Sequence, residues 1–116
     1  MKQFLEMKFY NKINKNIRYR SSYELKALKI LDNDISVVKY EYESIRIPYD
    51  NGKHNTIPDF IVTYANGIKK MIEVKCKALL KKFNNSIKIK AMKKYCKKND
   101  IQFELWMEEE LNIKKP

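Results

Sequence analysis

A chain of 116 residues, 44% of them hydrophobic, is long enough for one domain with a modest core and too apolar to be disordered. No apolar run approaches the ~20 residues of a membrane-spanning helix, and two cysteines are too few for an iron–sulfur cluster or a cysteine-rich zinc site. The formal charge of +11 indicates a polyanionic partner. We therefore expect a cytoplasmic protein with reduced thiols that binds nucleic acid and not a membrane.

The N-terminal part of the chain is predicted to be a basic arm or short helix over residues 1–20, followed by a capped helix. Ser21 or Ser22 is a suitable N-cap for a helix that runs to about Leu31. Glu24 lies in its first turn and shares a face with apolar residues at i+3, i+4 and i+7. This glutamate is either a capping-box residue favoured by the helix dipole or an acidic ligand.

Strands are predicted next. Residues 37–42 have the β-branched and aromatic composition of a strand, and residues 44–47 form a second strand or its continuation. Pro48 is expected to end it, because proline cannot donate to a sheet ladder. Residues 50–55 read as a polar loop, in which His54 is a loop residue or phosphate contact in preference to a general base.

The strongest local pattern is a hairpin of residues 57–64 and 68–75 around an Asn-Gly turn. A two-residue loop would place Asp59 and Glu73 on opposite faces of the sheet. A three-residue loop with a left-handed Gly67 would set Asp59 directly opposite Glu73. Only the second register separates an apolar face from a charged one, so we predict it.

In that register Asp59, Glu73 and Lys75 converge on one face. Two opposed carboxylates are suitable ligands for a hard divalent cation such as Mg²⁺. A neighbouring lysine can orient a water molecule and stabilise developing negative charge. The alternative is a surface cross-strand ion pair, which contributes little to stability.

The C-terminal third is predicted to contain a helix and a final strand. Residues 78–80 could begin a helix that an Asn-Asn pair breaks, after which Ser86 caps a helix to about Lys98. Residues 101–106 form a buried strand, which completes a strand–helix–strand crossover. The acidic residues of the tail, 107–116, are predicted to be a solvated end.

The positive charge is distributed unevenly. Between Lys69 and Lys98 a dense series of lysines is opposed by a single acid, Glu73. Such a field attracts a polyanion by counterion release. A solvated lysine-rich surface or a membrane-binding surface are the alternatives, but the basic residues do not accompany a large amphipathic helix with aromatic anchors. The predicted nucleic-acid contacts are Arg18, Arg20, His54, Lys77, Lys90, Lys93, Lys94 and Lys97.

The order helix, three strands, helix, strand, with the motif Pro58-Asp59 … Glu73-Val74-Lys75, resembles the PD-(D/E)xK (restriction-endonuclease-like) nuclease superfamily. The segment from Tyr19 to Glu24 is similar to phage endonuclease I-type junction resolvases, phage head-completion nucleases and TnsA-type transposase endonucleases. The resemblance implies an α/β fold of order α-β-β-β-α-β, a mixed central sheet flanked by helices, and a nuclease core over residues 21–106.

The resemblance also implies a function. Asp59, Glu73 and the Val74 carbonyl would hold Mg²⁺, with Mn²⁺ as a substitute, Glu24 as a further acidic ligand and Lys75 positioning the attacking water. The expected activity is endonucleolytic hydrolysis of branched or junction DNA by a homodimer, encoded by a phage or mobile element and acting in the bacterial cytoplasm. The alternatives are a catalytically silent DNA-binding module and a TnsA-like subunit that is active only with a transposase partner.

Overall fold

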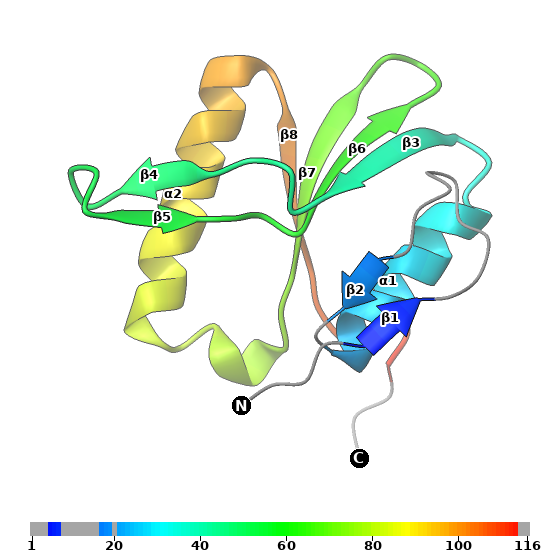
Figure 1. Cartoon of the computed structure of the whole chain (residues 1–116), viewed down its shortest axis with the longest axis horizontal. Coiled ribbons are helices and arrows are strands. Elements are labelled where there is room, and N and C mark those ends of the chain that lie inside the picture. The colour runs from blue at the N-terminus through cyan, green and yellow to red at the C-terminus, as the bar shows by residue number, and fades with distance from the viewer. Residues whose placement is uncertain (1–4, 8–16, 20, 114–116) are drawn as a thin grey trace.

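A mixed four-stranded sheet between two helices forms the centre of the computed structural model, which describes residues 5–7, 17–19 and 21–113 (Figure 1). The strands run in the order β3-β6-β7-β8. The first three are antiparallel neighbours, and β7 and β8 are parallel. The elements are α1 (Ser22–Asn33), β3 (Val37–Tyr42), β6 (Phe60–Tyr64), β7 (Lys69–Val74), α2 (Phe83–Asn99) and β8 (Gln102–Trp106). The predicted fold class is confirmed.

Each face of the sheet is covered by one helix. Phe60 and Val62 of β6 belong to the core that includes the buried stripe of α1. Ile61, between them, belongs to a second core with Met92 and Cys96 of α2. Successive residues of a strand point to opposite faces, so α1 and α2 lie on opposite sides of the sheet. This is the division of faces that the hydrophobic pattern predicts.

The β6–β7 hairpin has the predicted three-residue loop. The Tyr64 N–H donates to the Ile68 carbonyl at 2.9 Å, and Phe60 is paired with Ile72. Gly67 is left-handed, with φ of 86°. The Asp59 position therefore falls opposite Glu73, one step beyond the last paired residues.

Gly67→Ala is expected to destabilise the domain by about 1–2 kcal/mol, because an L-residue pays that penalty in the left-handed region. A Cβ at this position would meet nothing within 4 Å, so the whole effect is conformational. Urea unfolding of Gly67→Ala and Gly67→Asn measures it. Asn tolerates left-handed φ, so Gly67→Asn should lose much less stability than Gly67→Ala. Equal losses in the two variants would contradict this explanation.

The segment between β3 and β6 differs from the prediction. It forms a separate hairpin of β4 (Ile47–Tyr49) and β5 (His54–Thr56), which Figure 1 shows extending across α2. Pro48 lies inside β4, not after a strand, and His54 is in β5, not in a loop. Burial of Ile47 against the α2 core accounts for this hairpin. A two-stranded hairpin leaves the outer side of each strand unpaired, so it tolerates a proline.

The start of α2 also differs from the prediction. A short 3₁₀ helix, η1 (Lys77–Leu79), precedes it, and α2 begins at Phe83, so Ser86 is inside the helix and is not its cap. The Asn85 side chain donates to the Leu79 carbonyl at 2.5 Å. The asparagine that was expected to break the helix instead joins its first turn to η1.

The two ends of the chain need correction as well. Leu5–Met7 (β1) and Ile17–Tyr19 (β2) form an antiparallel pair, so the helical alternative for residues 1–20 is wrong where the structure describes them. In the tail, Glu108 and Leu111 are 8% and 2% exposed, and Leu111 packs in the α1 core. Among the described residues of the tail, Glu109, Glu110 and Asn112 are exposed. No helix in the described ranges is long and apolar enough to span a membrane.

Candidate active site

A cleft of about 590 Å³ lies where the first turn of α1 meets the start of β6 and the end of β7. Segments distant in sequence contribute to its walls, including the end of β5 and the first turns of α2. The structure brings all of the predicted catalytic and metal-binding residues to this cleft, namely Glu24, Asp59, Glu73, Val74 and Lys75.

Asp59 and Glu73 are held together by reciprocal backbone contacts. The Asp59 N–H donates to Glu73 Oε1 at 3.0 Å, and the Val74 N–H donates to Asp59 Oδ2 at 2.8 Å. The two residues are only 9% and 5% exposed. Each carboxylate thus uses one oxygen to fix its orientation on the backbone of the facing strand, and its second oxygen is not needed for that contact.

The electrostatics of this pair are unfavourable in the metal-free protein. Burial raises the pKa of Asp59 well above its usual range, and the charge of Glu73 raises it further. Burial also raises the pKa of Glu73, while Lys75 acts in the opposite direction. A cation beside the two carboxylates would offset both effects.

Lys75 is the cation nearest to Glu73 among the residues described. Its Nζ lies 3.7 Å from Glu73 Oε2, and its side chain is 24% exposed. Its backbone N–H donates to the Trp106 carbonyl at 3.0 Å, which ties it to the end of β8. The backbone at Lys75 is thereby anchored, and its ammonium group lies in the cleft lining beside Glu73.

Glu24 reaches the same cleft from α1. Its N–H donates to Ser21 Oγ at 3.3 Å, so Ser21 is the N-cap. Its side chain, 9% exposed, accepts a hydrogen bond from the Tyr42 hydroxyl at 2.5 Å. The charge of Glu24 is among the causes that raise the pKa of Asp59. Glu24 thus occupies a capped first turn and also faces the acidic pair.

The chemistry of the donor set fits a hard divalent cation. Mg²⁺ is commonly bound through one or two carboxylates and retains several waters, so the Asp59–Glu73 pair with a backbone carbonyl is sufficient. Within the described part of the chain, no three acidic, histidine or cysteine side chains are already arranged as a metal-binding group. The site therefore has two converging carboxylates and a third, Glu24, nearby.

The chain also matches a known family. Residues 34–108 match the model of the family described as TnsA-like endonuclease N terminal. The chain belongs to this family. The family is part of the restriction-endonuclease-like PD-(D/E)xK nuclease superfamily, which confirms the resemblance seen in the sequence. A search of curated proteins found no match.

The match of this TnsA-like domain includes Asp59, Glu73, Val74 and Lys75 but begins after α1. Glu24 lies outside it. The matched range therefore covers the hairpin residues of the cleft but not the residue that α1 contributes.

The predicted nucleic-acid contacts are spread over several surfaces of the TnsA-like domain. Lys90, Lys93, Lys94 and Lys97 are exposed on α2, and His54 is exposed on β5. The Lys77 ammonium forms an ion pair with Glu109 at 3.1 Å. Arg18 is described only as a backbone position of β2, and Arg20 lies outside the described residues.

Two charged residues of the cleft were missed by sequence reasoning. Lys88 lines the cleft from α2. It lies four and eight residues before the buried Met92 and Cys96, so the helical repeat placed it on the inner face of α2. Glu43 also lines the cleft and has a positive φ of 50°, and its N–H donates to the Asp59 carbonyl at 2.9 Å. A left-handed glutamate after a strand has no comparable sequence signal.

Proposed function

We propose that this TnsA-like domain is a metal-dependent DNA endonuclease that hydrolyses phosphodiester bonds. The observation that carries the proposal is the buried, reciprocally hydrogen-bonded pair of Asp59 and Glu73 beside Lys75 in an open cleft. Structural ion pairs are normally arranged to neutralise charge. Here two carboxylates with raised pKa values face each other, as is typical of functional sites.

Asp59, Glu73 and the Val74 carbonyl would hold Mg²⁺, for which Mn²⁺ can substitute. When bound, the metal would neutralise the negative charge that develops on the scissile phosphate. The backbone bonds to Asp59 Oδ2 and Glu73 Oε1 keep the two carboxylates oriented in advance of binding. Glu24 is the further acidic ligand that reaches the cleft from α1.

Lys75 has a separate task in the proposed reaction. Its backbone is anchored by the bond of its N–H to Trp106, and its ammonium group, beside Glu73, orients the attacking water for in-line attack on phosphorus. It also places positive charge where negative charge accumulates in the transition state. Lys88, which lines the cleft from α2, would contact a phosphate of a strand that enters the cleft.

The exposed lysines of α2 provide contacts that position the DNA backbone without reading bases. The proposal therefore favours recognition of DNA shape, such as a branch or junction, over a long sequence-specific site. Such a substrate has two strands to cut, so we predict a homodimer with one site for each strand. An origin in a phage or mobile element stays a prediction.

Nicking of supercoiled plasmid by the purified domain tests the proposal. We expect relaxed and linear products with Mg²⁺ or Mn²⁺ and none with EDTA. A panel of linear, nicked, flapped and four-way DNA then compares substrates, and branched forms are expected to be cut fastest. DNA binding with no cutting in either metal would contradict cutting by the domain alone, and a silent DNA-binding module would stay inactive whatever partner is added.

The family match favours a second candidate, a nuclease subunit that cuts only with a transposase partner. The same assay distinguishes it. In that case the domain alone is inactive in both metals, and cutting begins when the partner is added. Loss of that cutting in Asp59→Ala would still assign the chemistry to this cleft.

A further inference from the structure

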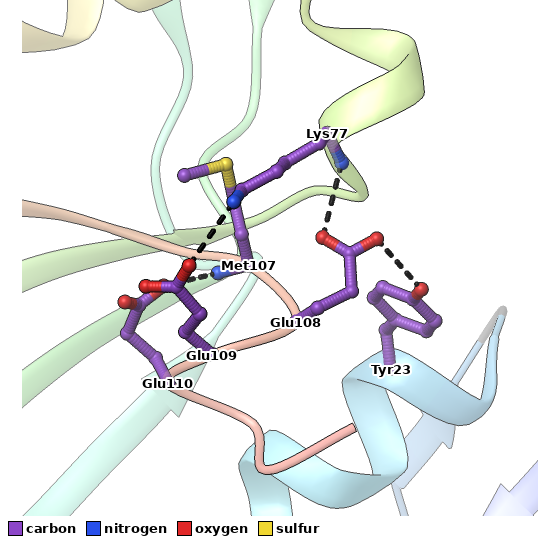
Figure 2. A network of polar contacts seen from close by, with 6 residues as sticks. All are labelled: Tyr23, Lys77, Met107, Glu108, Glu109 and Glu110. Carbon is purple, nitrogen blue, oxygen red and sulfur yellow. Dashed lines mark hydrogen bonds and ion pairs between the residues drawn. The ribbon is translucent and has the colours of Figure 1, made fainter. Parts of the chain in front are cut away.

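Glu108 is a buried carboxylate close to the cleft but outside it. It follows β8, is 8% exposed, and is not among the described residues that line the cleft. It accepts a hydrogen bond from the Tyr23 hydroxyl to Oε2 at 3.0 Å. It also accepts one from the Lys77 backbone N–H to Oε1 at 3.2 Å. Figure 2 shows the carboxylate between these two donors, which come from different parts of the chain.

The two donors belong to the two walls that carry the catalytic groups. Tyr23 is the neighbour of Glu24 in the first turn of α1, and Lys77 lies two residues after Lys75, at the start of η1. Tyr23 itself lines the cleft. One carboxylate thus connects the wall that holds Glu24 to the wall that holds Lys75.

The segment that presents Glu108 is itself firmly attached. The Glu108 carbonyl accepts from the Ile113 N–H at 2.8 Å, and the Met107 carbonyl accepts from the Leu111 N–H at 3.1 Å. Leu111 is buried in the α1 core. Glu108 is therefore presented from a fixed turn, packed against the helix whose first turn it contacts.

We propose that Glu108 is a positioning residue that fixes Glu24 and Lys75 relative to each other across the cleft. The inference rests on the proposed nuclease function. A buried carboxylate is expensive to retain, and an apolar side chain would fill the same space more simply. Its Oε2 accepts from one wall and its Oε1 from the other, and an apolar residue cannot provide this double acceptor.

The neighbouring Glu109 is a matched control. It also bonds to Lys77, but through the ammonium group, and its side chain is 77% exposed. An exposed pair of this kind contributes little. Glu109→Ala therefore removes a carboxylate from the same turn, and a contact to the same residue, without loosening the walls.

The experiment compares Glu108→Ala, Glu108→Gln, Tyr23→Phe and Glu109→Ala in single-turnover cleavage of bound DNA, with DNA affinity measured separately. Assays are run well below the unfolding midpoint of every variant. Glu108→Ala should slow the cleavage step about tenfold to a hundredfold with DNA affinity unchanged, because small displacements of catalytic groups are costly. Tyr23→Phe, which removes the bond to α1 and leaves the bond to Lys77, should have a smaller effect, and Glu109→Ala none.

Glu108→Gln separates positioning from direct chemistry. The glutamine carbonyl can accept from the Lys77 N–H while its amide donates to the Tyr23 oxygen, so both links persist without the charge. We expect it to cleave within about threefold of the wild type, since the links and not the charge position the walls. A Gln variant as slow as the Ala variant would overturn the proposal, as would an Ala variant that cuts at the wild-type rate.

Hydrogen exchange of the Lys77 amide keeps the two proposals distinguishable. Glu108→Ala should accelerate its exchange, and Glu108→Gln should not. If the wild type cuts no DNA, the proposed function fails. The exchange rate of the Lys77 amide in Glu108→Ala then decides whether Glu108 links the two walls. Unchanged protection in Glu108→Ala would overturn it.

Discussion

Asp59→Asn is expected to abolish metal-dependent cleavage while making the metal-free protein more stable. The asparagine carbonyl can still accept from the Val74 N–H, so the hairpin geometry is retained. The lost carboxylate oxygen removes a metal ligand, and a loss of several kcal/mol in transition-state stabilisation corresponds to about a thousandfold or more in rate. The opposing gain arises because a buried carboxylate no longer faces Glu73.

The sign of the stability change follows from the pKa of Asp59. Burial and Glu73 raise it in the folded protein, so the unfolded chain releases this proton first as pH rises. Stability is therefore lost as pH increases from about 4, the ordinary value for an aspartate, towards the raised folded value. Asp59→Asn removes that loss. Its stabilising effect should be small near pH 4 and largest at neutral pH.

Thermal unfolding in EDTA at both pH values measures this effect, and each kcal/mol is worth about 4 °C in a domain of this size. Asp50→Asn is the matched control, because Asp50 is exposed at the tip of the β4–β5 hairpin. It should change neither cleavage nor stability appreciably. An Asp59→Asn protein that is less stable than the wild type at neutral pH would contradict the description of a strained acidic pair.

Lys75→Met should slow cleavage strongly while leaving DNA binding nearly intact. The substitution keeps most of the apolar stem and removes the ammonium group that lies 3.7 Å from Glu73 Oε2. A group that orients water and stabilises developing charge typically contributes about a hundredfold to a thousandfold. One lysine among many basic residues contributes far less to DNA affinity, which depends on the whole positive field.

Lys69→Met is the control for this prediction. Lys69 is the first residue of β7 and is exposed, whereas Lys75 directly follows the other end of that strand, six residues later. Single-turnover rates and DNA affinities are measured for both variants. Lys75→Met should lower the cleavage rate, whereas Lys69→Met should change at most the DNA affinity. Equal rates in the two variants would remove Lys75 from the mechanism.

The site could be predicted from sequence because its main parts are local. Alternating apolar residues and a glycine at the third loop position are enough to set the register that places Asp59 opposite Glu73. Likewise, the helical repeat placed Glu24 on the buried face of α1. Both inferences need only the period of an element and the geometry of one turn.

What could not be predicted depends on contacts between distant segments. The β4–β5 hairpin exists because Ile47 is buried against α2, and that packing overrides the usual reading of Pro48 as a strand end. The bond between Glu108 and Tyr23 joins residues 85 positions apart. In the sequence Glu108 is one of three consecutive glutamates, and only the tertiary fold distinguishes the buried one from its exposed neighbours.

The most direct test of the central claim is the location of a bound metal. Crystals of the wild-type domain grown with Mn²⁺ are expected to show an anomalous peak between the carboxylates of Asp59 and Glu73. The same crystals of Asp59→Asn should lack it. Wild-type crystals with no peak in this cleft at saturating Mn²⁺, or with one only at another site, would contradict the assignment of these two residues as the metal centre.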